Sequence, residues 1–149
     1  MLYLDSPGYI SLSGRILLSA IFLLSGINKF LNPQATQQYM ADHGMGATGF
    51  FLICAILIEV GAGLSLAFGF WTRTAALLLT LFMIPTTLIF HTNFEDPMQI
   101  IQFLKNMAMM GGLLYVYAYG PGPISVDARL AFPKPDETLE ERESYRRTG

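Results

Sequence analysis

The chain has 149 residues, of which 52% are hydrophobic and 13% are charged, and its formal net charge is −2. A soluble domain usually carries about 25% charged residues, so this composition argues against a soluble protein and favours a membrane-embedded one. There is no basic stripe with interleaved aromatic residues, which excludes a nucleic-acid-binding module. A single cysteine, Cys54, excludes an intramolecular disulfide and a CxxC redox pair.

Four stretches of the chain are long and apolar enough to form helices that cross a bilayer, which takes about 20 mostly apolar residues. They cover residues 13–31, 48–68, 72–90 and 99–119. The turn and capping residues that separate them are Asn32-Pro33, Gly69, Asp96-Pro97 and the run from Gly120 to Pro123. The sequence therefore predicts an all-α fold, a four-transmembrane-helix bundle with up-down-up-down topology, in one domain over residues 1–130.

The distribution of Lys and Arg predicts the orientation of this bundle, because cytoplasmic loops hold the excess of these residues. In the expected topology the N-terminus, the second connection and the tail share one side. That side holds Arg15, Arg73, Arg129, Lys134, Arg142, Arg146 and Arg147. The other side holds only Lys29 and Lys105, so we expect both termini in the cytoplasm and a multi-pass protein of the bacterial inner (plasma) membrane. Residues 131–149 form a charged cytoplasmic tail, and Arg15 and Arg73 are interpreted as orientation anchors.

The first outer connection, about residues 33–47, is long for a helix bundle. It carries several polar side chains together with Tyr39 and His43. We expect this segment to lie along the membrane surface as a lid.

Glu59 is the most informative charge, because it falls near the middle of the second apolar stretch. An ionisable group in the hydrocarbon region costs about 2.5 to 3.5 kcal/mol on insertion scales, so it should face the bundle and find a partner. Ala55, Gly63 and Ala67 share its helical face, and such small residues mark close helix contact. This pattern turns Glu59 inward. It favours a functional site over a Glu–Lys clamp that merely fixes packing, although the clamp remains an alternative.

Other polar residues fall in the outer half of the predicted bundle. Lys29 ends the first stretch, His91 ends the third, and Lys105 and Asn106 lie about one turn into the fourth. We hypothesise that they converge with Glu59 on a polar cavity that opens outward. Two alternatives stay open: Lys29 can extend its ammonium to the lipid headgroups, and His91 can be an interfacial residue at a helix end.

Lys105 is harder to explain as a surface residue. Its neighbours on one helical face are Ala108, Met109 and Gly112, which are small or soft and suit an interior-facing stripe. We therefore expect Lys105 to face the interior of the bundle.

Metal binding is the weaker interpretation of these side chains. The two histidines, His43 and His91, are far apart in the sequence, and no HxxxH or ExxH pair occurs. No metal site is predicted.

Taken in order, short motifs along the chain resemble those of the DoxX family of small bacterial four-helix membrane proteins, over about Gly14 to Arg129. The matching pieces are Arg15 with Ser25-Gly26 and Lys29, then Gln38-Tyr39-Met40-Ala41, Glu59 with Gly61 and Gly63, the turn Gly69-Phe70-Trp71-Thr72-Arg73, His91, Lys105-Asn106, and Gly120-Pro121-Gly122 with Ser125 and Asp127. Their order and spacing carry the resemblance. The family label implies an oxidoreductase, by association with a subunit of a quinol oxidase or a thiosulfate:quinone oxidoreductase, and a role in oxidative or electrophile stress.

The residues themselves limit how such a protein could handle electrons. The usual ligand patterns of a haem, a flavin, an iron–sulfur cluster or a cysteine pair are absent from the sequence, so a bound quinone is the cofactor or substrate we consider. We predict catalytic roles for Glu59 as a proton relay and for Lys105 and His91 as partners of a quinone oxygen. The binding residues are predicted to be Lys29, Asn106 and Tyr39. The predicted pocket walls are Phe22, Tyr39, Phe90 and Phe103.

The first hypothesis is thus a membrane oxidoreductase or accessory redox subunit that handles quinone-like or other hydrophobic small molecules. The second is a non-catalytic membrane binder, carrier or complex-assembly partner whose buried charges only hold the bundle together. A transporter ranks last, because four short helices offer no repeat or broken helix pair. Expected partners are the lipid bilayer, a quinone-like molecule, and a second copy or a larger redox complex.

Overall fold

The computed structural model describes residues 6–131, and every regular element in that range is a helix. The helices are α1 (Ser6–Leu31), α2 (Pro33–Asp42), α3 (Thr48–Phe68), α4 (Thr72–Phe90), α5 (Pro97–Tyr119) and α6 (Val126–Ala131). The prediction of an all-α fold is confirmed. The expected charged tail, apart from its first residue, lies outside the described residues.

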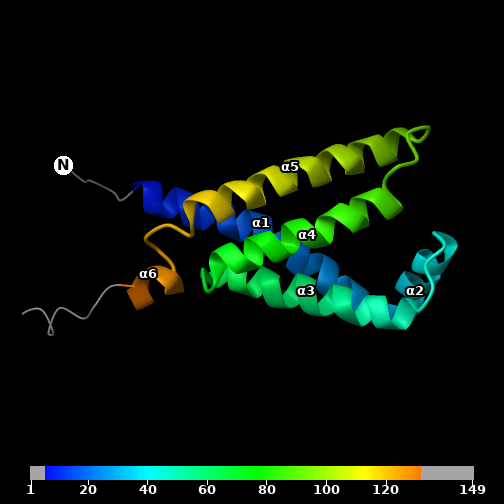
Figure 1. The fold of residues 1–149 in the computed structure, drawn as a ribbon, viewed down its shortest axis with the longest axis horizontal. Coiled ribbons are helices and arrows are strands. Elements are labelled where there is room, and N and C mark those ends of the chain that lie inside the picture. The colour runs from blue at the N-terminus through cyan, green and yellow to red at the C-terminus, as the bar shows by residue number, and fades with distance from the viewer. Residues whose placement is uncertain (1–5, 132–149) are drawn as a thin grey trace, which may run out of the picture.

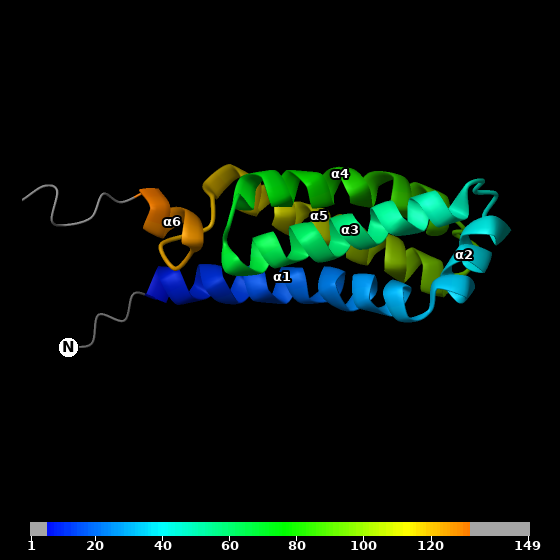
Figure 2. The same cartoon turned by 90° about the horizontal axis from the view of Figure 1, so that it is seen from below.

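The four long helices lie side by side, with α2 at one end of the bundle and α6 at the other (Figures 1 and 2). These are called the α2 end and the α6 end below. Helix α1 packs along α3, α3 packs beside α4, and α4 packs beside α5, whereas α1 and α5 contact each other much less. The fourth side of the bundle is therefore the loosest.

Three of the helices are long and apolar enough to cross a membrane, and the segments concerned are Gly8–Leu31, Thr48–Phe68 and Thr72–Phe90. Their outer faces carry large exposed apolar side chains such as Leu17 (75% exposed) and Leu57 (67% exposed), as suits contact with lipid. Helix α5 is long but does not belong to this group. Its first half carries Gln99, Gln102, Lys105 and Asn106, which lower its mean hydropathy.

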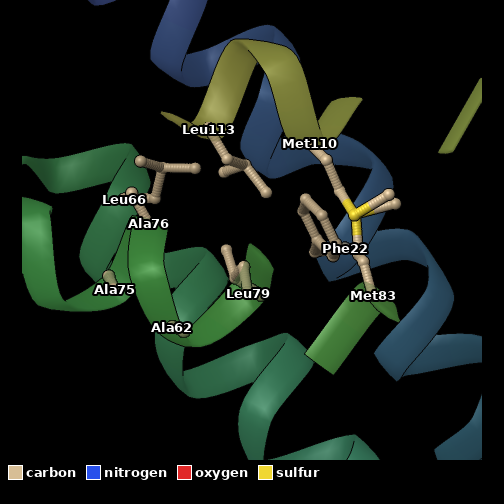
Figure 3. Packing of buried hydrophobic residues seen from close by; sticks show 9 residues of the cluster. All are labelled: Phe22, Ala62, Leu66, Ala75, Ala76, Leu79, Met83, Met110 and Leu113. Atoms are coloured by element: carbon tan, nitrogen blue, oxygen red, sulfur yellow. The ribbon is translucent and has the colours of Figure 1, made fainter. Parts of the chain in front are cut away.

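The hydrophobic core draws side chains from all four long helices (Figure 3). It consists of Phe22, Ala62, Leu66, Ala75, Ala76, Leu79, Met83, Met110 and Leu113. Three of these residues are alanines on α3 and α4, and larger side chains from all four helices pack around them. This core fixes the helices from which the polar side chains of the α2 end project.

The helix bounds differ from the expected ones in three places. Helix α1 begins at Ser6 and α5 at Pro97, each earlier than the apolar stretch alone indicated. At α5 the extension follows from capping, because Asp96 accepts a hydrogen bond from the backbone N–H of Met98 (2.9 Å) and a proline is favourable in the first helical turn. The first outer connection contains a helix, α2, which also starts with a proline, Pro33.

Candidate functional site

Lys29 and Glu59 form an ion pair inside the bundle. The Lys29 Nζ lies 2.9 Å from each carboxylate oxygen of Glu59, and Glu59 is only 4% exposed. Ser25 completes the group: its hydroxyl accepts from Lys29 Nζ at 2.7 Å and donates to Glu59 Oε1 at 3.1 Å. Three side chains thus tie α1 to α3 through one closed hydrogen-bonded ring.

The local sequence explains why this ring can close. Ser25 and Lys29 lie one turn apart on α1 and so share a face. Gly26, between them, touches α3: a Cβ there would lie 2.7 Å from Val60 Cγ2 and 3.2 Å from the Cβ of Glu59. The absence of a side chain at Gly26 brings the two backbones close enough for the ion pair to form.

A cavity of about 580 Å³ lies beside the ion pair. Its volume falls in the range of about 300 to 1,000 Å³ that is usual for small-molecule sites. The polar lining comprises Ser25, Asn28, Lys29, Asn32, Thr36, Glu59, Thr86, His91, Gln102 and Asn106. The apolar lining comprises Ile21, Phe22, Ala35, Tyr39, Met40, Phe82, Met83, Phe90 and Met109. The cavity therefore suits a molecule with a polar head and an apolar body.

The polar groups on α4 and α5 are held by neighbouring side chains. Asn106 is buried and donates from Nδ2 to the hydroxyl of Thr87 at 2.9 Å. The Nδ1 of His91 lies 2.8 Å from Gln99 Oε1, across the turn that joins the two helices. Both side chains keep one defined orientation at the cavity wall.

Aromatic rings meet where α2 approaches the end of α4. The ring of Tyr39 stacks on that of Phe90 with 5.3 Å between centroids, and the ring of His43 meets Phe90 edge-on at 5.1 Å. Tyr39 and Phe90 both line the cavity. Helix α2 therefore covers the end of the cavity through aromatic contacts with α4.

The structure brings five of the six predicted site residues to this cavity, namely Glu59, His91, Lys29, Asn106 and Tyr39. Lys29 turns back to Glu59, so its ammonium is engaged inside the bundle and does not extend to the headgroups. The catalytic and binding roles assigned to these residues remain predictions.

Lys105 and Phe103 are absent from the lining. Contrary to the expectation of an inward orientation, Lys105 is exposed, and its Nζ lies 3.4 Å from the Oε1 of Gln102, which does line the cavity. Successive residues turn by about 100° around a helix, so the buried position belongs to the neighbouring Asn106. Phe103 instead packs edge-on against Phe94, with 5.3 Å between centroids.

Arg15, predicted to be an orientation anchor, lies inside the bundle. Arg15 is 1% exposed, and its guanidinium donates to the carbonyls of Leu66 (3.2 Å), Ala67 (3.1 Å) and Ile124. It thus joins α1 to the end of α3 and to the segment before α6. The available signal was its helical face, which it shares with the buried Ser19.

Asp127, one of the motif residues, completes this cluster at the α6 end. Its carboxylate accepts from the N–H of Trp71 (2.8 Å), the N–H of Thr72 (2.9 Å) and the Thr72 hydroxyl (2.7 Å), which caps the start of α4. Burial raises the pKa of Asp127. The hydrogen bonds from Thr72 and Trp71 and the charge of Arg15 outweigh this effect, so the pKa lies below its ordinary value.

The positions of the metal-ligating side chains among the described residues bear on metal binding. Between residues 6 and 131, no three His, Cys, Asp or Glu side chains are grouped so that they could hold a metal ion.

Residues 10–92, which run from α1 to just past α4, match the DoxX family model. The chain belongs to the DoxX family. It is 41% identical over 119 residues to the inner membrane protein YqjF of Escherichia coli K12, covering 80% of this chain and 90% of that protein. It is also 33% identical over 123 residues to the inner membrane protein YphA of the same organism, covering 79% and 88%. No solved structure matches the chain.

These likenesses and the apolar helices make this DoxX protein an inner membrane protein, in contact with the lipid bilayer. The family match includes the ion pair, Tyr39 and His91. Asn106 and Lys105 follow it in the sequence.

Proposed function

We propose that this DoxX protein binds a quinone-like or other hydrophobic small molecule beside Lys29 and Glu59, and that it acts as a membrane oxidoreductase or an accessory redox subunit. One observation carries the proposal: the buried ion pair forms part of a cavity wall. The Lys29 side chain is 21% exposed whereas that of Glu59 is 5% exposed, so the ammonium is the more accessible partner. A clamp that only fixed helix packing would need no cavity next to it.

The chemistry of a quinone fits the donors that surround this cavity. Reduction to the quinol takes up two electrons and two protons. Lys29 would donate a hydrogen bond to one quinone oxygen and stabilise the negative charge that develops there. Glu59, bonded to Lys29 and Ser25, would relay protons. His91 and Asn106, on the other helices, would contact the second oxygen, and the electrons would come from a separate reductant or a partner protein.

A second candidate is a non-catalytic binder, carrier or assembly partner. The observation in its favour is that Lys29 bonds both carboxylate oxygens of Glu59, so that each charge neutralises the other and joins α1 to α3. In this case the cavity binds its ligand without changing it.

The membrane arrangement that accompanies this proposal has four spans, with the α6 end in the cytoplasm. Helix α5 would be the fourth span: at about 1.5 Å per residue it is about 35 Å long, and its polar Gln102 and Asn106 line the cavity. Exposed Arg73 and Arg129 at the α6 end agree with a cytoplasmic location. Cysteines placed at residues 45 and 129 in a Cys54→Ala background should be labelled from the periplasm and the cytoplasm respectively. The reverse pattern would refute the orientation.

The binding proposal is tested with purified protein in phosphatidylethanolamine–phosphatidylglycerol nanodiscs. The probe is a benzoquinone with a decyl tail, and its Kd is measured for the wild type, for Lys29→Met/Glu59→Gln, and for Arg129→Gln as a control. The double variant removes both charges together and so leaves no unpaired charge in the bundle. We expect its Kd to rise at least tenfold and that of the control to stay unchanged; an unchanged Kd in the double variant overturns the proposal.

The redox part is separated by following quinone absorbance with a chemical reductant present. The wild type should accelerate quinol formation and the double variant should not. Tight binding without acceleration, also when membrane extract is added as a source of partner proteins, would establish the non-catalytic candidate instead.

A further inference from the structure

The ion pair at the cavity wall lies well inside the length of the candidate spans. Glu59 stands about 17 Å along α3 from Thr48, at about 1.5 Å per residue, and the hydrocarbon region is about 30 Å thick. Helices α1 and α4, which supply nine of the 19 lining residues, and α3, which supplies Glu59, are the three candidate spans. A ligand must therefore reach the ion pair either through the α2 end or sideways from the lipid.

The α2 end is only partly covered, because Asn32, Ala35 and Tyr39 line the cavity there and are exposed. Helix α2 places Met40 in the interior (5% exposed), and the stacked rings of Tyr39 and Phe90 join it to α4. The path along the helix axes from the aqueous side thus meets an aromatic contact and a buried side chain.

The side between α1 and α5 is different. These two helices touch nearer the α6 end, where a Cβ on Gly112 would lie 3.2 Å from Leu18 Cδ2. Just beyond α5, the carbonyl of Pro121 accepts a hydrogen bond from the Ser11 hydroxyl of α1 at 2.8 Å. Toward the α2 end they diverge, as Figure 1 shows. We call the opening between residues 21–28 of α1 and residues 101–109 of α5 the slot.

Exposure along the two helices shows that the slot is open at the surface of the bundle. Lys105 lies two turns before Gly112 on the same face of α5, yet it is exposed, and Ile101 one turn further is 48% exposed. On α1, Ile21 and Asn28 line the cavity and are exposed as well. Residues that would be buried if α1 and α5 packed along their whole length lie instead at the edges of an opening.

We propose that the ligand reaches the cavity laterally from the bilayer through the slot, and that it is a lipid-dissolved molecule whose polar head sits at Lys29 and Glu59 while its apolar tail stays in the slot and in lipid. This inference rests on the proposed binding in the cavity. The polar side chains of the inner cavity wall suit the polar head of the ligand. The apolar side chains of Ile21, Ile101 and Met109 along the slot suit its tail. Lys105, hydrogen-bonded to Gln102 at the slot edge, meets the head as it passes.

The inference is tested with two photoreactive probes in the same nanodiscs. Both are decyl-tailed benzoquinones; one carries a diazirine on the ring and the other at the tip of the tail, and labelled residues are identified by mass spectrometry. We expect the ring probe to label cavity residues and the tail probe to label the slot edges. Lateral access is overturned if the tail probe labels the outer faces of α3 and α4 as strongly as the slot edges. It is also overturned if the tail probe labels the α2 end. If the ring probe labels no cavity residue, the proposed function itself falls.

Variants test the route directly. Ile101→Trp/Ala108→Trp adds bulk at the slot edge, at two exposed positions that do not line the cavity. We expect cavity labelling by the ring probe to slow at least tenfold. Met107→Trp/Leu114→Trp, at exposed positions on a different face of α5 from Ile101 and Ala108, is the matched control and should label at the wild-type rate. An unchanged rate in the slot variant, with both proteins folded by circular dichroism, overturns the inference.

Discussion

The two ends of the bundle use buried charge in different ways. At the α6 end, Arg15 bonds three backbone carbonyls and Asp127 bonds two backbone N–H groups, so each charge completes a helix terminus. Nearer the middle of the bundle, Lys29 and Glu59 bond each other beside a cavity that extends toward the α2 end. The charged groups of Arg15 and Asp127 are bonded to the backbone and so stabilise the positions of the helix ends. Those of Lys29 and Glu59 are bonded to each other at a cavity wall, where a ligand can reach them.

Packing reinforces this contrast. Gly69, at the end of α3, has a φ of +70°, and a Cβ there would lie 2.5 Å from the Cβ of Ser125. The chain is so close at this point that no side chain fits. The α6 end is thus tightly packed around Gly69, whereas the cavity beside the ion pair extends toward the α2 end.

The largest effect is expected at Arg15. Arg15→Ala leaves buried carbonyls without donors and opens a void, and we expect a loss of about 3 to 5 kcal/mol in the free energy of unfolding, the range for breaking a buried charged interaction. Denaturation in mixed detergent micelles measures it. Arg73→Ala, an exposed arginine of α4, should change stability by less than about 0.5 kcal/mol. Equal stability of the two variants would remove the distinction between the ends.

The next effect sharpens the comparison at the α2 end. Lys29→Met leaves Glu59 as an uncompensated buried charge, and we expect a loss of about 2 to 3 kcal/mol, below the range for fully buried pairs because the Lys29 side chain is 21% exposed. Lys29→Met/Glu59→Gln should return to within about 1 kcal/mol of the wild type, since no charge is left unpaired. The same denaturation series measures both. If the double variant loses as much free energy of unfolding as Lys29→Met, the ion pair acts as a structural clamp between α1 and α3.

The smallest effect concerns pH at the α6 end. The pKa of Asp127 is lower in the folded state, so its contribution is complete above the unfolded-state pKa of about 3.9 and is lost as the pH falls through the folded-state value. Asp127→Ala should cost about 1 kcal/mol at pH 7, as for a lost helix cap. Thermal unfolding of both proteins between pH 7 and pH 2 should show this difference shrinking with acid. Glu95→Ala, at an exposed carboxylate, should show no such trend, and a constant difference for Asp127→Ala would rule out the carboxylate as its origin.

Much of the site could be predicted from the pattern of single helices. Small residues on the helical face of Glu59 indicated that its side chain points into the bundle. Polar residues in the outer half of the bundle indicated where the cavity lies. The interpretation of Lys105 was wrong about its burial for an instructive reason. Its stripe with Gly112 does face α1, but the two helices diverge toward Lys105, so the same face is partly covered at Gly112 and exposed at Lys105.

The sequence by itself determined the class of protein, the family, and the places where proline, glycine and Asp96 separate the helices, because these depend on composition and on short-range backbone chemistry. Only the tertiary structure decided that Glu59 pairs with Lys29 and that Arg15 reaches carbonyls 51, 52 and 109 residues away. Helical periodicity fixes the direction of a side chain around its own axis. The distance between two axes depends on the side chains of both helices, which no single segment contains.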